Sequence, residues 1–206
     1  MIIDKLHYIS QAAAQGSHLA AIEKVLKKGG KWIQLRVKEQ AEEEVLELAM
    51  EARLLCSAYN AKLIINDYPR IALEVGAYGV HLGLDDMPVP EARAILGHSK
   101  CIGGTANTFG DILRRAAEGV DYIGLGPYCF TTTKKNLSPV LGLEGYCRIL
   151  QQMDKAGIAI PVIAIGGIGL PDIDLLLSAG VHGIAVSGLL TGSNNLNEDF
   201  YVQYSR

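Results

Sequence analysis

Eight short runs of apolar and β-branched residues recur along the chain, and longer segments of good helix formers separate most of them. The runs, in chain order, are Leu6–Ile9, Trp32–Arg36, Leu63–Asn66, Gly79–His81, Cys101–Gly103, Tyr122–Leu125, Val162–Ile165 and Ile184–Val186. Short runs that are apolar throughout are typical of parallel strands buried on both faces. The intervening helices are clearest at Ala41–Tyr59 and Asp111–Ala117.

This alternation of strands and helices is compatible with two architectures, an open doubly wound sheet and a closed barrel. An open doubly wound sheet would show it too, but eight units in 206 residues favour a closed barrel near its compact limit. We therefore predict an α/β fold, a (β/α)8 TIM barrel that forms one domain over residues 1–206. Around Ala77–Val80, Gly119–Tyr122 and Ala179–Ile184 we expect a left-handed glycine to end a helix directly before the next strand. The longest predicted loop is Thr131–Gly142.

Charge and cysteine usage narrow the class of protein. The formal net charge of −3 offers no basic surface for nucleic acid or a membrane. No signal peptide is recognisable, and no apolar run reaches the ~18 residues of a membrane span. The four scattered cysteines, Cys56, Cys101, Cys129 and Cys147, are expected to be reduced thiols. We predict a cytoplasmic enzyme that acts on small molecules, and a homo-oligomer stays open.

Polar residues follow the second predicted strand, where a barrel of this kind builds its active site. Strand alternation places Gln34, Arg36 and Lys38 on one side, opposite Leu35 and Val37. An amide and two cations at the barrel mouth suit a polar ring and a phosphate group. The alternative is a solvated strand end with an ion pair to Glu39.

Carboxylates follow the third and fourth predicted strands. Asn66 and Asp67 end the third, and His81 is followed by Asp85 and Asp86 after the fourth. Carboxylates from neighbouring strand ends can share one Mg²⁺, whose remaining positions are filled by water and substrate oxygens. The alternatives are an N-cap role for Asp67 and turn roles for Asp85 and Asp86.

Further anion-binding features follow the later strands. Gly103-Gly104-Thr105 combines open backbone with a hydroxyl, and Thr131–Lys135 brings hydroxyls and lysines into the longest loop. Glycine-rich turns at Gly166-Gly167 and Ser187-Gly188 follow the seventh and eighth strands, the recurrent phosphate site of this fold. The barrel mouth is thus predicted to hold two anion sites, one with a metal and one without.

The ordered set QLRVK, IIND, HLGLDD, GGTA, DYIGLGP, TTTKK, PVIAIGGI and GIAVSG resembles the thiamine phosphate synthase family over nearly the whole chain. The resemblance implies a transferase that couples hydroxymethylpyrimidine diphosphate to a thiazole phosphate. Pyrophosphate is released in a largely dissociative reaction that uses Mg²⁺.

The resemblance also implies roles for individual residues. Asp67 and Asp86 would bind Mg²⁺, and Arg36, Lys38 and Lys134 would neutralise the leaving diphosphate as the catalytic residues. The remaining substrate contacts would be made by Gln34, Asn66, His81, Thr105, Thr131, Thr133, Gly167, Ser187 and Gly188. No side-chain nucleophile is needed, because the nucleophile is the thiazole nitrogen.

Two other functions stay open at this point. A thiazole tautomerase resembles the synthase in sequence and fold, but it has no need to grip a diphosphate. A non-catalytic barrel that binds a phosphorylated ligand would gain little from the paired carboxylates. Asp67, Asp86, Lys38 and Lys134 together favour the synthase over both.

Overall fold

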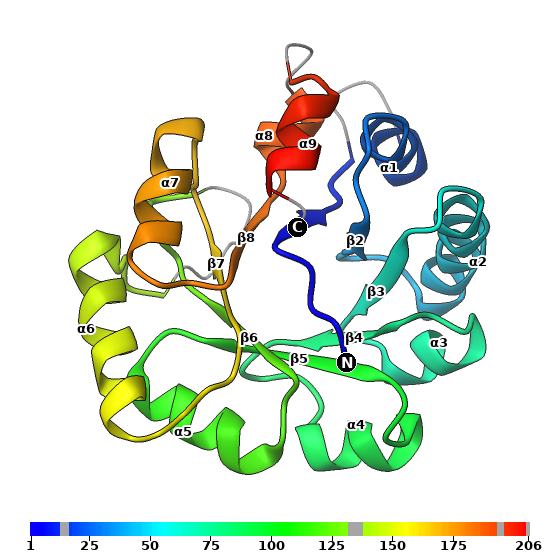
Figure 1. The fold of residues 1–206 in the computed structure, drawn as a ribbon. Helices are drawn as coiled ribbons and strands as arrows, with labels where there is room; N and C mark the ends of the chain where they lie inside the picture. The colour runs from blue at the N-terminus through cyan, green and yellow to red at the C-terminus, as the bar shows by residue number, and fades with distance from the viewer. Residues whose placement is uncertain (13–16, 132–137, 193–195, 205–206) are drawn as a thin grey trace.

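A computed structural model describes residues 1–12, 17–131, 138–192 and 196–204 of the chain. Its eight strands pair in parallel with their neighbours in chain order and close into a barrel, which the helices surround (Figure 1). The strands are β1 (Leu6–Ile9), β2 (Trp32–Leu35), β3 (Lys62–Asn66), β4 (Gly79–Leu82), β5 (Cys101–Ala106), β6 (Tyr122–Leu125), β7 (Val162–Ile165) and β8 (Gly183–Val186). The predicted (β/α)8 barrel is confirmed.

Each strand is followed by helical structure on the outside of the barrel. The helices are α1 (His18–Lys27), α2 (Glu42–Ala58), α3 (Pro69–Glu74), α4 (Val89–Leu96), α5 (Phe109–Glu118), α6 (Gly142–Lys155), α7 (Leu170–Ser178), α8 (Gly188–Gly192) and α9 (Glu198–Tyr204). Within the described ranges, no helix is long and apolar enough to cross a membrane.

The differences from the predicted bounds have local causes. β2 ends at Leu35 rather than Arg36, because the backbone N–H of Arg36 donates to the Ser10 hydroxyl instead of extending the strand ladder. β5 runs on to Ala106, since its glycines pair with β6. α5 begins at Phe109, before the predicted Asp111, because Thr108 and Asp111 form a reciprocal capping box.

The predicted helix-ending glycines are confirmed. Gly76, Gly119 and Gly180 have positive φ angles of 63°, 80° and 104° and lie just before β4, β6 and β8. In this left-handed region a side chain would be strained, so glycine ends each helix and turns the chain toward the next strand.

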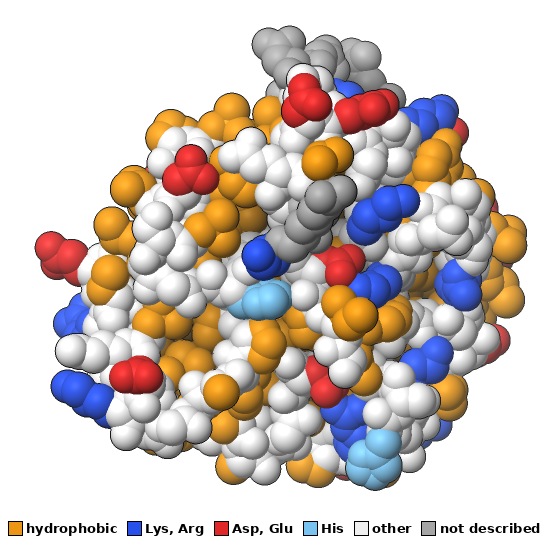
Figure 2. All heavy atoms as spheres, viewed as in Figure 1, with side chains coloured by type: hydrophobic (Ala, Val, Ile, Leu, Met, Phe, Trp, Pro, Cys, Tyr) orange, Lys and Arg blue, Asp and Glu red, His pale blue; other side chains and the backbone are white. Residues whose placement is uncertain are grey.

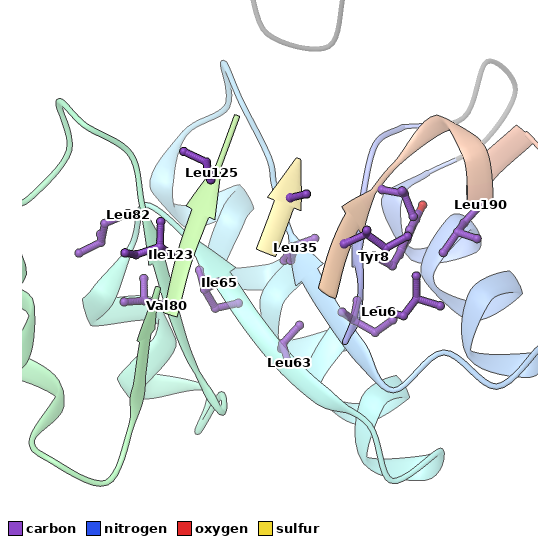
Figure 3. Packing of buried hydrophobic residues seen from close by; sticks show 14 of the residues in the cluster. Leu6, Tyr8, Leu35, Leu63, Ile65, Val80, Leu82, Ile123, Leu125 and Leu190 are labelled. Atoms are coloured by element: carbon purple, nitrogen blue, oxygen red, sulfur yellow. The ribbon is translucent and has the colours of Figure 1, made fainter. Parts of the chain in front are cut away.

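Strand alternation divides the apolar residues between two cores. Residues such as Leu63, Ile65, Val80 and Leu82 point outward and pack between the sheet and the helices (Figure 3). A smaller cluster of inward-facing residues fills the barrel interior. It consists of Ile9, Trp32, Ile64, Cys101, Tyr122, Ile163 and Ala185. The barrel is therefore a packed core and not a pore, and only its ends can hold a ligand.

All four cysteines are free thiols, and Cys56 and Cys101 are buried. On the face shown in Figure 2, Lys and Arg side chains are interspersed with Asp and Glu and form no broad region of one sign.

Candidate functional site

A cavity of about 450 Å³ opens at the carboxyl ends of the strands. Every predicted site residue that the structure describes lines it: Gln34, Arg36, Lys38, Asn66, Asp67, His81, Asp86, Thr105, Thr131, Gly167, Ser187 and Gly188. Thr133 and Lys134 lie outside the described residues. Residues from seven strand ends thus meet in one place, as closure of the barrel requires.

The side chains after β2 reach the cavity by simple alternation. Gln34 belongs to the cavity wall, whereas Leu35 and Val37 are buried in the core between sheet and helices. Ser10 supports this segment, because its hydroxyl accepts from Arg36 N at 3.1 Å and contacts His18 Nδ1 at 2.9 Å. Burial and the nearby Arg36 lower the pKa of His18, which keeps a second positive charge away from the guanidinium.

Two carboxyl groups and a lysine meet beside β3 and β4. Lys38 Nζ forms an ion pair with Asp67. The end of β2 is therefore not simply solvated, which was the alternative that the sequence left open. The carboxyl groups of Asp67 and Asp86 are themselves hydrogen-bonded. Burial, followed by that contact, raises the pKa of Asp67 to about 6, whereas hydrogen bonds from Asp67 and from the Gly83 N–H hold the pKa of Asp86 below its usual value.

This carboxyl pair fits a hard divalent cation. Two carboxylates in contact repel unless a proton or a cation lies between them, and Mg²⁺ in substrate-phosphate sites usually takes only one or two carboxylates. In the part of the chain that the structure describes, no group of three or more His, Cys, Asp or Glu could hold a metal. Any metal here would therefore complete its shell with water and substrate oxygens.

Of the alternative roles left open by the sequence, the structure does not support the N-cap role of Asp67 but does show a turn role for Asp86. The N-cap of α3 is Tyr68 and carries no side-chain cap bond, so Asp67 does not cap that helix. Asp67 instead has a positive φ of 70°, a strained conformation that is common at functional sites. Asp86 does have a turn role, because its Oδ2 accepts from Gly83 N at 2.6 Å, and this leaves its carboxyl group in the cavity wall.

A buried polar chain crosses the floor of the cavity. His81 Nε2 lies 3.0 Å from the Thr105 hydroxyl, and His81 Nδ1 lies 3.0 Å from the Tyr122 hydroxyl. Burial raises the pKa of Tyr122 far above its ordinary value, so the phenol stays neutral. The His81 ring is thereby held at both nitrogens, and the Thr105 hydroxyl is oriented with it.

The turns after β7 and β8 form the opposite wall. Gly166 and Gly167 have φ angles of 95° and 68°, and a Cβ on Gly167 would lie 2.7 Å from the Phe130 carbonyl oxygen. Only glycine therefore allows this turn to approach the loop after β6. Ser187 directly follows β8, and its hydroxyl is buried in this wall.

Two buried polar atoms of the cavity residues have no hydrogen-bond partner among the described residues. They are Asn66 Nδ2 and Ser187 Oγ, on opposite sides of the barrel. A buried donor without a partner costs free energy, and a polar ligand would remove that cost. Both positions are therefore sites at which a ligand would gain a hydrogen bond.

The sequence alone did not identify the apolar part of the wall. Ile9, Pro127 and Ile165 also line the cavity, as does Ser138 from the loop after β6. Ile9 and Ile165 end β1 and β7 on the inward side, so their position at strand ends was the available signal. They give the cavity surface against which an aromatic ring can pack.

The closed barrel and this polar cavity at the strand ends define the class as a (β/α)8-barrel enzyme. Residues 6–190 match the family model described as thiamine monophosphate synthase. A thiamine-phosphate synthase of Flavobacterium johnsoniae is 51% identical over 96% of this chain and 97% of its own. One from Bacteroides fragilis is 52% identical over 90% of this chain and 91% of its own.

A solved structure agrees with these relatives. The thiamine phosphate pyrophosphorylase from Pyrococcus furiosus superposes with a TM-score of 0.79 at 31% identity, covering 93% of this chain and 89% of that one. The chain belongs to the thiamine monophosphate synthase family.

Proposed function

We propose that this enzyme is a transferase that joins hydroxymethylpyrimidine diphosphate to a thiazole phosphate, giving thiamine phosphate and pyrophosphate. The observation that carries the proposal is one cavity with two different anion-binding walls. The wall at β2–β4 combines cations with a carboxyl pair, and the wall at β7–β8 offers glycine turns and a buried hydroxyl. Two such walls suit two phosphorylated substrates that must meet.

The diphosphate side is assigned to residues of β2 to β5. Gln34, Asn66 and His81 would contact the pyrimidine, and Thr105 the diphosphate. Asp67 and Asp86 would hold Mg²⁺, which when bound neutralises charge on the leaving pyrophosphate.

Charge neutralisation is the main catalytic contribution of the chain in this proposal. The carbon–oxygen bond to the diphosphate breaks, and the thiazole nitrogen forms a bond to the same carbon. Arg36 and Lys38, together with Lys134, would stabilise the negative charge that accumulates on the departing pyrophosphate. Preorganised donors of this kind typically each contribute about 10²–10³ in rate. The role of Lys134 is a prediction from the sequence, since that residue lies outside the described part of the chain.

The second substrate is assigned to the opposite wall. Gly167, Ser187 and Gly188 would bind the phosphate of the thiazole, with Thr131 and Thr133 from the loop after β6. Backbone N–H groups of a glycine turn can surround phosphate oxygens without a metal. The apolar residues Ile9 and Ile165 would pack against the rings between the two walls.

Incubation with both phosphorylated substrates and Mg²⁺ tests the proposal, with thiamine phosphate and pyrophosphate measured together. Equal amounts of the two products are expected. Conversion of one thiazole tautomer into the other without coupling would instead favour the tautomerase, and ligand binding without turnover would favour the non-catalytic barrel. Lys134→Ala is expected to lower kcat for coupling and to leave any tautomerase activity unchanged. A cytoplasmic location and one domain over residues 1–206 are part of the proposal.

A further inference from the structure

Arg115 of α5 is a charged side chain in the interior, with only 2% of its surface exposed. A buried guanidinium is costly unless its donors are satisfied. Here Nε donates to the Thr105 carbonyl at 3.1 Å, Nη2 to the Gly83 carbonyl at 2.6 Å and Nη1 to Glu118 Oε2 at 2.8 Å. The charge is therefore paired within α5, and the two other donors point at the barrel.

Both carbonyls belong to strand ends that build the diphosphate wall. Thr105 is part of β5, and its hydroxyl contacts His81. Gly83 directly follows β4, and its own N–H donates to Asp86 at 2.6 Å. The Gly83 residue is thus held on both sides, by Arg115 at its carbonyl and by Asp86 at its N–H. The position of the Asp86 carboxyl group is in this way tied to the guanidinium.

Two glycines make room for this arrangement. A Cβ on Gly104 would lie 2.9 Å from Arg115 Cδ, and one on Gly83 would lie 2.5 Å from Asp86 Oδ2. Larger residues would displace the guanidinium or the carboxylate. Arg115 itself is not among the residues that line the cavity.

We propose that Arg115 is a positioning residue that holds the ends of β4 and β5 at the spacing needed by the Asp86 carboxylate and the Thr105 hydroxyl. It touches no substrate, and it acts through the Gly83 and Thr105 backbone. This inference rests on the proposed function, because it concerns the wall assigned to the metal and diphosphate. Partners that orient metal ligands typically contribute about 10–100-fold to metal affinity.

Arg93 of α4 provides a matched control at the other end of the barrel. Its guanidinium donates to the Lys100 carbonyl at 2.6 Å, the Gly119 carbonyl at 3.4 Å and Asp121 Oδ2 at 2.8 Å. Lys100 precedes β5 and Asp121 precedes β6, so Arg93 joins the amino ends of neighbouring strands. It is a similar arginine clamp that is remote from the cavity.

The experiment compares Arg115→Gln, Arg115→Lys and Arg93→Gln by calorimetric binding of inorganic pyrophosphate in the presence of Mg²⁺. Arg115→Gln is expected to weaken this binding about 10–100-fold. Arg115→Lys keeps the charge but not the planar fork, so an intermediate loss is expected. Arg93→Gln should leave the affinity for pyrophosphate unchanged, even if it lowers the free energy of unfolding as much as Arg115→Gln does.

A second measurement separates positioning from general damage. The KM for the thiazole phosphate should stay unchanged in Arg115→Gln, because the wall at β7 and β8 does not contact Arg115. Unchanged pyrophosphate affinity in Arg115→Gln, or an equal loss in Arg93→Gln, would overturn the inference. If Arg115→Gln does not fold, the same criteria apply to Arg115→Lys. Wild-type protein that neither binds magnesium pyrophosphate nor forms thiamine phosphate would overturn the proposed function instead.

Discussion

The two ends of the barrel use the same strands for different purposes. At the amino end, Lys62 of β3 forms an ion pair with Asp4 at 2.6 Å and lies 5.3 Å from the centre of the Trp32 ring. At the carboxyl end, Lys38 pairs with Asp67, whose carboxyl group is also in contact with that of Asp86. At the amino end one lysine faces one carboxylate. At the carboxyl end one lysine, Lys38, faces the two carboxyl groups of Asp67 and Asp86.

The residues around these two ion pairs also differ between the amino and carboxyl ends of the barrel. At the amino end the His7 ring stacks on Trp32 with centroids 4.2 Å apart, and Tyr122 meets Trp32 edge-on at 5.6 Å. One polar atom at this end, Trp32 Nε1, has no hydrogen-bond partner among the described residues, whereas the carboxyl end has two, Asn66 Nδ2 and Ser187 Oγ, and both belong to residues that line the cavity. The amino end is therefore built for stability, and the carboxyl end gives up stability for binding.

The largest effect is expected from Trp32→Ala at the amino end. Removal of this buried ring should lower the free energy of unfolding by about 3–5 kcal/mol, while kcat per folded molecule stays near wild type. Urea unfolding and turnover of the same preparation measure both. Trp32→Phe is the control, since it keeps a ring against His7. Loss of turnover without loss of stability would break the division between the two ends.

Asp86→Asn, at the carboxyl end, should instead lower activity much more than stability. Thiamine phosphate formation is expected to fall at least about 10²–10³-fold, because an amide cannot neutralise a cation, while the amide oxygen can still accept from Gly83 N. Steady-state assays across Mg²⁺ concentrations measure the loss. Asp85→Asn, at a neighbouring carboxylate of the same cavity, is the control and should have a small effect. Full activity in Asp86→Asn would exclude the proposed metal site.

The amino end should also make stability depend on pH through His7. Burial lowers the pKa of His7 well below its ordinary 6.5, so below that pH the unfolded chain binds a proton that the folded chain refuses. Stability should therefore fall as the pH drops from about 7.5 to 5.5, by up to about 1.4 kcal/mol per pH unit. Urea unfolding across this range should give a shallower slope for His7→Phe. Equal slopes would show that His7 is not responsible.

The smallest change in the free energy of unfolding, and a gain, is expected from Asp67→Asn. The pKa of Asp67 is raised to about 6, so its charged form destabilises the fold above that pH and has no effect well below pH 4. Asparagine also tolerates the positive φ at this position. The variant should be inactive and more stable at pH 8 by on the order of 1 kcal/mol, with the gain lost near pH 4.

Asp4→Asn is the matched control at the amino end. It removes the partner of the half-buried Lys62, so it should lower the free energy of unfolding. Unfolding curves at pH 8 compare the two variants directly. A gain in Asp4→Asn, or a loss in Asp67→Asn, would contradict the assignment of stability to one end and binding to the other.

Most of the fold could be predicted because its signals are local. The eight strands and the glycines that end helices depend on residues close together in the chain. The wall of Gln34, Arg36 and Lys38 follows from alternation along one strand. The contact between the carboxyl groups of Asp67 and Asp86 could not be predicted in this way, since it depends on the spacing of two different strand ends.

By itself the sequence determined the barrel, its order of strands and the polar residues placed at the strand ends. Only the tertiary structure decided that Arg115 is buried, because the sequence DILRR predicts no more than a helix. Its partners lie 10 and 32 residues away and come within reach only when β4 and β5 pair. Hydrophobic periodicity specifies which face of a helix is inward, but closure of the barrel decides what an inward charge will meet.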